Sequence, residues 1–178
     1  ALLSGLAPQL LVANEVQPHR AQLVVQALRA YGHRDSRSAR QVVAADGRNS
    51  AWQVGSFALV VADVPCSGLG ALRRRPESRW RRGPEVISEL SGLQRALLAN
   101  AIAATMPGGV IAYITCSPHR AETVDVVAGA SGVQVLDAPG LLPAVPAAAS
   151  RLDNRFIQLW PHTHGSDAMF CALLRRTS

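Results

Sequence analysis

Apolar segments of strand length alternate with amphipathic segments of helix length along most of this 178-residue chain. The predicted strands cover residues 9–15, 41–46, 57–63 and 110–115. The two predicted helices between them begin at Pro18 and Pro84 and end before Gly32 and Pro107. Such regular alternation predicts an α/β fold with a doubly wound, mostly parallel sheet, rather than an all-helical or all-strand architecture.

The apolar stripes of the two helices predict which of their residues face the sheet. The first stripe consists of Leu23, Val24, Ala27, Leu28 and Tyr31. The second consists of Val86, Leu90, Leu93, Leu97 and Ile102. Towards the C-terminus the sequence predicts a helix at 121–130, a short strand at 133–137 and an antiparallel pair at 155–160 and 168–175. This length suits one domain, so we expect residues 1–178 to form a single domain.

The composition is that of a globular protein, with 48% hydrophobic and 17% charged residues. The first residues carry no basic leader, and no apolar run is long enough to span a membrane. Cys66, Cys116 and Cys171 are far apart and form no CxxC pair, which argues against a disulfide framework and against a zinc site. We therefore expect a cytoplasmic protein that binds no metal and does not associate with membranes.

Positive charge is concentrated in one segment. The net charge is +6, all 18 strongly basic residues are arginines, and six of these lie between residues 73 and 82 beside a single acid, Glu77. Such a run is often a solvated surface loop. Arginine also binds phosphate in bidentate fashion, and a tryptophan offers a face on which a base can stack, so the segment is equally compatible with a nucleic-acid partner such as RNA. The candidate RNA-binding residues are Arg73, Arg74, Arg75, Arg79 and Trp80.

Acidic residues follow three successive predicted strands, at Glu15, Asp46 and Asp63. One acid after a strand is often only a helix cap. In open α/β sheets, however, ligands bind beyond the carboxyl ends of the strands, and carboxylates there accept ribose hydroxyls or an adenine amino group. Three such acids in succession predict a site for a nucleoside-containing cofactor.

Two cysteines also follow strands. Cys66 lies in the segment Asp-Val-Pro-Cys-Ser-Gly after the strand at 57–63, and Cys116 lies in Thr-Cys-Ser-Pro after the strand at 110–115. A single cysteine at a strand end is more often a small buried apolar residue. If the two strands are neighbours, both thiols lie at the same edge of the sheet, beside Asp63.

These two cysteine segments resemble those of the Sun/Nop2 family of RNA cytosine-5 methyltransferases, which includes the Fmu-type bacterial enzymes. The resemblance implies a Rossmann-like methyltransferase domain that uses S-adenosylmethionine on RNA, with small-subunit ribosomal RNA as the preferred substrate. It implies that Cys116 is the nucleophile and that Cys66 assists product release. Asp63 would contact the cytosine ring and would belong, with Glu15 and Asp46, to the cofactor-binding residues.

The chemistry of such an enzyme requires a thiolate, which adds to carbon 6 of cytosine and makes carbon 5 nucleophilic. Because an ordinary thiol has a pKa of about 8.5, Cys116 needs help to ionise. Ser117 and Pro118 have the residue types of a helix cap and a first helical position, so we expect Cys116 to face the positive end of a helix. Arg120 is expected to add to this effect.

The family places a first strand and a Gly-rich cofactor loop upstream of Ala1, and this sequence begins after them. From this we expect weak cofactor binding by these 178 residues, and self-association through the exposed edges of the sheet.

Two other functions remain open. A cysteine hydrolase would pair Cys116 with His119, although no third orienting residue is evident, and a serine hydrolase is disfavoured because Ser67 lacks the preceding glycine. A non-catalytic RNA-binding fragment of a methyltransferase is the other alternative. Methyl transfer from labelled cofactor to RNA separates these readings.

Overall fold

The computed structural model describes residues 8–29, 39–49, 51–81, 83–141 and 143–178. The chain divides into two compact units, Ala1–Ala51 and Trp52–Ser178. The predicted α/β character is confirmed in both, and helices accompany a sheet in each. Tyr31, which the first predicted apolar stripe includes, lies outside the described residues.

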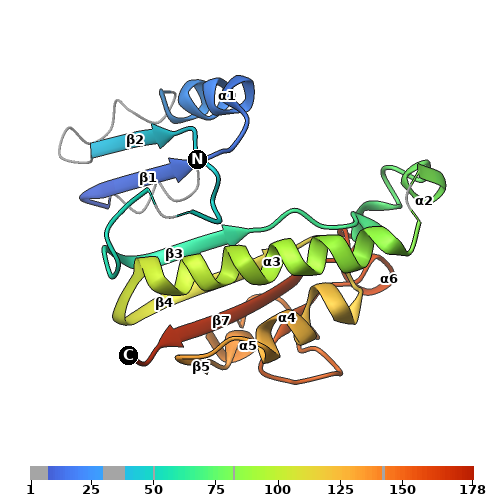
Figure 1. Cartoon of the computed structure of the whole chain (residues 1–178). Helices are drawn as coiled ribbons and strands as arrows, with labels where there is room; N and C mark the ends of the chain where they lie inside the picture. Colours follow the sequence, from blue (N-terminus) through green and yellow to red (C-terminus); the bar gives the residue numbers. More distant parts are fainter. Residues whose placement is uncertain (1–7, 30–38, 50, 82, 142) are drawn as a thin grey trace. The chain divides into compact units, whose positions relative to one another are not determined.

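The described residues of the first unit form a two-stranded parallel sheet and one helix. Strand β1 spans Leu10–Asn14, helix α1 spans Pro18–Arg29, and strand β2 spans Ala39–Val43 (Figure 1). Both strands were predicted, but β2 ends three residues before Asp46, so this acid lies in the turn beyond the strand.

The buried face of α1 differs from the predicted stripe. Ala21 and Leu28 are buried, whereas Leu23 is 60% exposed. The difference follows from the helical period, because residues seven apart lie on one face while a residue two positions from Ala21 lies about 200° around the helix. Apolar character alone therefore did not identify the packed face.

The second unit is built on a five-stranded sheet in the order β3-β4-β7-β5, with β6 also paired to β7. Its strands are β3 (Phe57–Asp63), β4 (Thr105–Thr115), β5 (Val133–Val135), β6 (Ile157–Gln158) and β7 (Phe170–Arg176). Only the β3–β4 pair is parallel; β7 is antiparallel to β4, β5 and β6. The predicted C-terminal antiparallel pair is confirmed as β6 and β7, with β6 shorter than expected.

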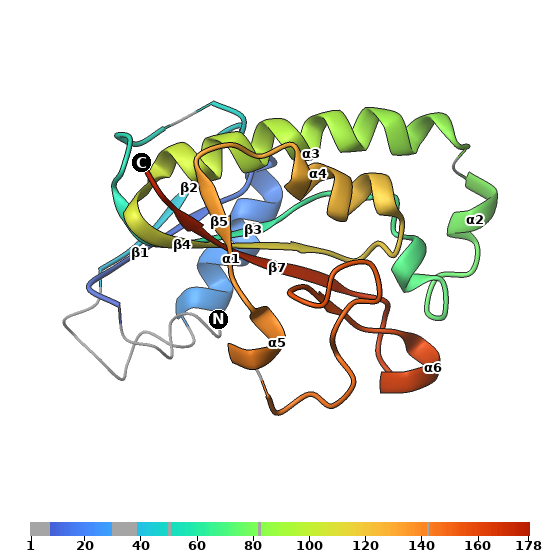
Figure 2. The same ribbon diagram turned by 90° about the horizontal axis from the view of Figure 1, so that it is seen from below.

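Helices cover both faces of this sheet, as a doubly wound arrangement requires. Figure 2 shows α3 and α4 on one face and α5 on the other. The helical segments of the second unit are η2 (Leu69–Ala71), α2 (Ser78–Arg81), α3 (Glu85–Ala104), η3 (Arg120–Glu122), α4 (Val124–Ala128), α5 (Ala138–Leu141) and α6 (Pro161–His164). Among the described residues no helix is both long and apolar enough to cross a membrane.

The buried face of α3 is more polar than the predicted stripe. It consists of Ser91, Gln94, Leu98, Ala101 and Ala104, whereas the predicted residues, such as Leu93 and Leu97, are only partly buried. The reason is that Gln94, which is fully buried, donates a hydrogen bond to the Pro65 carbonyl at 2.8 Å. The helix therefore turns a polar residue towards the loop that carries Cys66.

The core of the second unit lies between α3, α4 and the sheet. Its largest fully buried apolar side chains are Tyr113, Phe170, Leu98, Ile111 and Leu174. The rings of Tyr113 and Phe170 meet edge to face, with their centroids 6.3 Å apart. This packing holds β4 and β7 against each other, and so positions the end of β4, which Cys116 directly follows.

Candidate active site

Parallel pairing of β3 and β4 brings the two cysteines together. Asp63, the last residue of β3, lies opposite Ile114, and the next backbone N–H, of Val64, donates to the Ile114 carbonyl at 3.0 Å. Cys66 and Cys116 lie in the loops that follow these two strands, at the same edge of the sheet. Their Sγ atoms are 3.1 Å apart, within hydrogen-bond distance for sulfur. The predicted meeting of the two thiols beside Asp63 is therefore what the structure contains.

The contact between the thiols separates their pKa values. The hydrogen bond with Cys116 lowers the pKa of Cys66 to about 6, despite the opposing effect of burial. The pKa of Cys116 is raised, first by the hydrogen bond with Cys66 and then by burial and by the nearby charges of Cys66 and Asp63. Desolvation also raises the pKa of Asp63. At neutral pH the two thiols therefore share one proton and one negative charge.

The predicted activation of Cys116 by a helix terminus is wrong. Residues 117–119 are irregular, and the next helical segment, η3, begins at Arg120 with His119 as its cap. The Ser117 hydroxyl accepts a hydrogen bond from the His119 N–H at 3.1 Å instead of capping a helix that faces the thiol. Arg120 forms an ion pair with Asp125 at 2.8 Å. The Ser-Pro pattern predicted that a helix begins here. In the structure, Ser117 forms tertiary contacts instead.

Glu122 joins the two cysteine loops, and sequence reasoning missed it. It is fully buried, and its carboxyl group accepts hydrogen bonds from the hydroxyls of Ser67 and Ser117, both at 2.6 Å. Ser67 directly follows Cys66, and Ser117 directly follows Cys116. In the sequence Glu122 resembles a polar position in the predicted helix at 121–130, so nothing there identified it as part of the site.

Gly70 lies where three loops approach closely. Its N–H donates to the Cys116 carbonyl at 3.0 Å, and its own carbonyl accepts from the Ala168 N–H at 2.9 Å. A Cβ atom at this position would lie 2.1 Å from the Ala168 oxygen and 2.6 Å from the Cys116 oxygen. Only glycine fits, and the Cys66 loop is thereby fastened to the Cys116 loop and to the segment before β7.

The arginine-rich segment continues from this junction. Arg73 and Arg74 both pair with Asp167, through Nε atoms 3.1 Å and 2.9 Å from its carboxylate oxygens, and Arg74 contributes most to lowering the Asp167 pKa. Further along, in α2, Trp80 is 78% exposed and the Arg79 guanidinium lies 4.5 Å from its ring centroid. The arginine-rich segment thus exposes cations and an aromatic face to solvent. It begins directly after the junction at Gly70, which joins the two cysteine loops.

In the first unit, parallel pairing places Glu15 and Asp46 beyond the same ends of β1 and β2. The Glu15 N–H donates to the Val43 carbonyl at 3.1 Å, which continues the ladder one residue past β1. Asp46 is engaged by Arg48 through both its backbone N–H, at 3.0 Å, and its guanidinium, and these bonds lower the Asp46 pKa to about 2. Both acids can accept hydrogen bonds from the hydroxyl and amino groups of a nucleoside. In this structure, however, Asp46 accepts hydrogen bonds from Arg48.

Comparison with known proteins supplies the family. Residues 2–175 match the family described as 16S rRNA methyltransferase RsmB/F. The chain belongs to this family. The resemblance to Sun/Nop2 enzymes that the two cysteine segments indicated is thereby confirmed, and the match covers both compact units.

Relatives within and around the RsmB/F family agree with this assignment. MT1451 of Mycobacterium tuberculosis, which is named as a methyltransferase, is 48% identical over 99% of this chain. Ribosomal RNA small subunit methyltransferase F of Cronobacter sakazakii is 31% identical over 68% of the chain. A mitochondrial tRNA (cytosine(34)-C(5))-methyltransferase of Danio rerio is 36% identical over 71% of it. The chain spans 38%, 26% and 35% of the lengths of these relatives, respectively.

Solved structures share the fold. The crystal structure of PH0851 superposes with a TM-score of 0.78 and 26% identity, covering 93% of this chain and 36% of that one. NSun6 from Pyrococcus horikoshii, solved with SFG, superposes with a TM-score of 0.75 and 21% identity, covering 94% and 41% of the two chains. The RsmB/F chain therefore has the α/β fold of these proteins, in agreement with the predicted class.

The hydrolase alternative does not fit the RsmB/F site. The Nδ1 atom of His119 accepts a hydrogen bond from the Ala121 N–H at 3.2 Å, where it caps η3 rather than contacting Cys116.

Within the described ranges no group of three or more histidine, cysteine or acidic residues could hold a metal ion. The chemistry available at this site is that of the thiols and Asp63.

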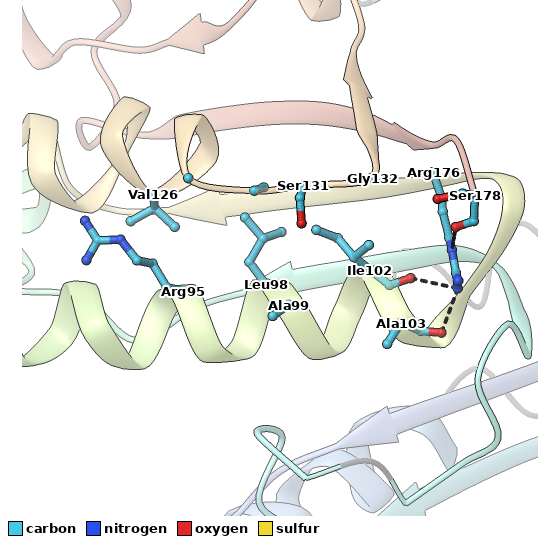
Figure 3. A pocket seen from close by; sticks show the side chains of 12 residues that line it. Arg95, Leu98, Ala99, Ile102, Ala103, Val126, Ser131, Gly132, Arg176 and Ser178 are labelled. Atoms are coloured by element: carbon cyan, nitrogen blue, oxygen red, sulfur yellow. Dashed lines mark hydrogen bonds between the residues drawn. The ribbon is translucent and has the colours of Figure 1, made fainter.

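A separate pocket of about 350 Å³ lies at the other end of the sheet (Figure 3). Its lining includes Leu98 and Ile102 from α3 and Arg176 from β7. Arg176 donates to the carbonyls of Ile102 and Ala103, at 3.2 and 2.9 Å, and so caps the C-terminus of α3. Because β4 runs from this end towards Cys116, the pocket is not part of the thiol site, and Arg176 has a structural role.

The lowered pKa of Cys66 and the raised pKa of Cys116 predict how the two thiols react with iodoacetamide. Only thiolates react, so alkylation of Cys66 should be half-maximal near pH 6 and fall about tenfold per pH unit below it. Cys116→Ala removes the hydrogen-bond donor and should move that midpoint upward. Cys171, whose pKa burial raises to about 11, is the internal control and should remain unmodified at pH 7. Peptide-resolved mass spectrometry measures all three; a wild-type Cys66 midpoint near the ordinary 9.0 would contradict this assignment.

Proposed function

We propose that the whole protein transfers a methyl group from S-adenosylmethionine to carbon 5 of a cytosine in RNA, through a covalent bond between Cys116 and carbon 6. The observation that carries the proposal is the contact between two thiols, 3.1 Å apart, directly beyond a strand that ends in Asp63. The names of two relatives support it, since one acts on small-subunit ribosomal RNA and the other on carbon 5 of a tRNA cytosine. We further propose that the chain forms one catalytic domain in the reducing cytoplasm.

The first step requires a Cys116 thiolate, and the neighbouring cysteine can provide it. Cys66, whose lowered pKa leaves it ionised at neutral pH, accepts the Cys116 proton across the 3.1 Å contact. The Cys116 sulfur then adds to carbon 6, and the electron pair moves through the ring towards carbon 5 and nitrogen 3. Asp63, whose pKa is raised by desolvation, can hold a proton against the polar edge of the ring and stabilise this charge.

Release of the product requires a base next to the nucleophile. After methylation, carbon 5 carries both the methyl group and a proton, and the bond to Cys116 cannot break until this proton leaves. Once Cys66 has passed its own proton to solvent, its thiolate takes the proton from carbon 5. The electron pair of that C–H bond restores the ring double bond, and the Cys116 thiolate departs. The contact between the two thiols therefore contributes to both the ionisation of Cys116 and the release of the product.

Two acids of the first unit fit the cofactor. S-adenosylmethionine, when bound, supplies the methyl group from its sulfonium sulfur. Glu15 and Asp46 lie beyond adjacent parallel strands as charged acceptors, and would hold the ribose hydroxyls and the adenine amino group. Asp46 must exchange its hydrogen bonds with Arg48 for those with adenine. Asp63 is proposed to complete the cofactor-binding residues.

The proposal is tested by methyl transfer from labelled S-adenosylmethionine to small-subunit ribosomal RNA with the whole protein. Bisulfite sequencing of RNA from wild-type and deletion strains identifies the cytosine. Transfer to carbon 5 of a single cytosine is the expected result. RNA binding without any methyl transfer would instead support the non-catalytic alternative, and transfer to another ring position would exclude the mechanism described above.

The arginine-rich segment is proposed to bind the RNA backbone near the site. Replacing Arg73, Arg74 and Arg75 together with alanine should weaken RNA binding and reduce the slope of log affinity against log salt by about 2, because each single-strand phosphate contact contributes about 0.7. Arg155→Ala, which removes an exposed, ion-paired arginine outside the segment, is the control and should leave the slope unchanged within about one contact. Filter binding at several salt concentrations measures this; an unchanged slope in the triple variant would return the segment to a solvated surface loop.

A further inference from the structure

The carboxyl group of Glu122 accepts four hydrogen bonds from residues that border the two cysteines or pack against them. Its Oε2 atom accepts from the Ser67 and Ser117 hydroxyls, both at 2.6 Å. Its Oε1 atom accepts from the Ser67 N–H at 2.7 Å and from the Gln94 amide at 3.2 Å. One side chain thus connects the residue after Cys66 with the residue after Cys116.

Burial makes these bonds hard to replace. Glu122, Ser117 and Gln94 are fully buried, and Ser67 is 5% exposed. Water therefore has no access that would let it take over a lost partner, and a buried donor or acceptor left unpaired is costly. The two serine hydroxyls could each rotate elsewhere if they were exposed; here the shared carboxylate oxygen determines where both point.

The group is also fastened to the rest of the second unit. Gln94 donates both to Glu122 and to the Pro65 carbonyl, at 2.8 Å, and so ties the carboxyl group to α3 and to the residue before Cys66. The Tyr113 hydroxyl donates to the backbone carbonyl of Glu122 at 2.8 Å, from within β4. The carboxyl group therefore has a fixed position relative to the helix and the sheet, rather than moving with either loop.

We propose that Glu122 is a positioning residue that holds the Cys66 and Cys116 loops at the separation the paired thiols need. Its catalytic consequence rests on the proposed function, because a proton can pass between the sulfurs only while they remain in contact. Glu122 itself does not reach the reacting atoms; it acts through Ser67 and Ser117. The chemistry requires a carboxylate here, since a single oxygen must accept from two hydroxyls while its neighbour accepts from two N–H groups.

Glu122→Gln tests this requirement with almost no change in size. If the amide oxygen keeps the Ser67 N–H and Gln94, the amide nitrogen faces both serine hydroxyls and can only donate. Ser117 already accepts from the His119 N–H, so its own proton would lose its acceptor. The variant should retain the fold but loosen the two loops. Asp125→Asn, an exposed acid three residues away that pairs with Arg120, is the matched control.

Phenylarsine oxide reports the thiol spacing without RNA or cofactor. It condenses with two thiols to form a cyclic dithioarsinite and one water, so its affinity rises with how well the two sulfurs are preorganised. In the whole protein, wild type should bind it tightly, Cys66→Ala should lose that binding, and Glu122→Gln should bind at least tenfold more weakly. Asp125→Asn should match wild type. Equal affinity of Glu122→Gln and wild type would overturn the proposal.

Two further measurements keep the positioning role separate from stability and from the proposed reaction. If Glu122→Gln fails to fold, Ser117→Ala removes the Glu122 contact on the Cys116 side, together with the bond from the His119 N–H, and wild-type arsenical affinity in that folded variant would equally overturn the proposal. In methyl transfer, Glu122→Gln should lower kcat at least tenfold and leave the KM for S-adenosylmethionine unchanged. If wild type methylates no RNA while the arsenical series behaves as expected, the positioning role stands and the proposed function fails.

Discussion

Cys66→Ala is expected to trap RNA on the protein, whereas Cys116→Ala is expected to abolish methylation without trapping. Without the Cys66 thiol, Cys116 must lose its proton to solvent, so the adduct should form more slowly than in wild type. The nearest group that could remove the carbon 5 proton is also gone, so the methylated adduct, once formed, should persist on Cys116. Without Cys116, no bond to carbon 6 forms. Each substitution removes one sulfur atom from the same 3.1 Å contact, so a difference between them reflects chemistry.

Denaturing electrophoresis after incubation with RNA and cofactor measures the outcome. Cys66→Ala should give a covalent protein–RNA band, and the double variant should lose it, because the adduct needs Cys116. Cys171→Ala, which removes a partly buried thiol on β7, is the matched control and should form no band while remaining active. Trapping by Cys116→Ala alone would reverse the two roles, and full activity of both single variants would exclude a covalent mechanism.

Gly70→Ala is expected to destabilise the second unit by about 3 kcal/mol or more. The added methyl group would lie 2.1 Å from the Ala168 oxygen and 2.6 Å from the Cys116 oxygen, both backbone atoms of residues that already form hydrogen bonds with Gly70. Relief requires the loops to separate, which breaks both hydrogen bonds. Loss of the thiol contact should follow, so methyl transfer should fall even in the fraction that remains folded.

Gly92→Ala provides a control of the opposite sign. Gly92 lies within α3, where an added Cβ meets no atom within 4 Å, so alanine should be neutral or stabilise by up to about 1 kcal/mol. For a chain of this size, the loss at Gly70 corresponds to a fall in Tm of roughly 6–12 °C. Calorimetry and denaturant titration of both variants measure the difference. Equal stability of Gly70→Ala and wild type would show that the three loops are not packed as described.

The sequence by itself predicted the elements that carry the site. Apolar runs bounded by proline and glycine identified β3 with its observed ends, the start of α3 and the C-terminal antiparallel pair, because local periodicity reflects the alternation of buried and exposed positions. It also predicted that Cys66 and Cys116 meet, because parallel neighbours end at the same edge of a sheet. The two cysteine segments also indicated the family, because the residues that carry its chemistry are concentrated in a few adjacent positions.

Only the tertiary structure decided how the thiols are held and how their pKa values are shifted. The helix expected after Ser117 is replaced by irregular chain, because the Ser117 hydroxyl bonds Glu122 rather than acting as a cap. The hydrogen bond between the two thiols lowers the pKa of Cys66 and raises that of Cys116, and it joins residues 50 positions apart in the sequence. Ser67 and Glu122 are 55 residues apart, and no local pattern encodes a bond over that separation. Such bonds arise from how the strands and α3 pack, and here they determine the geometry of the site.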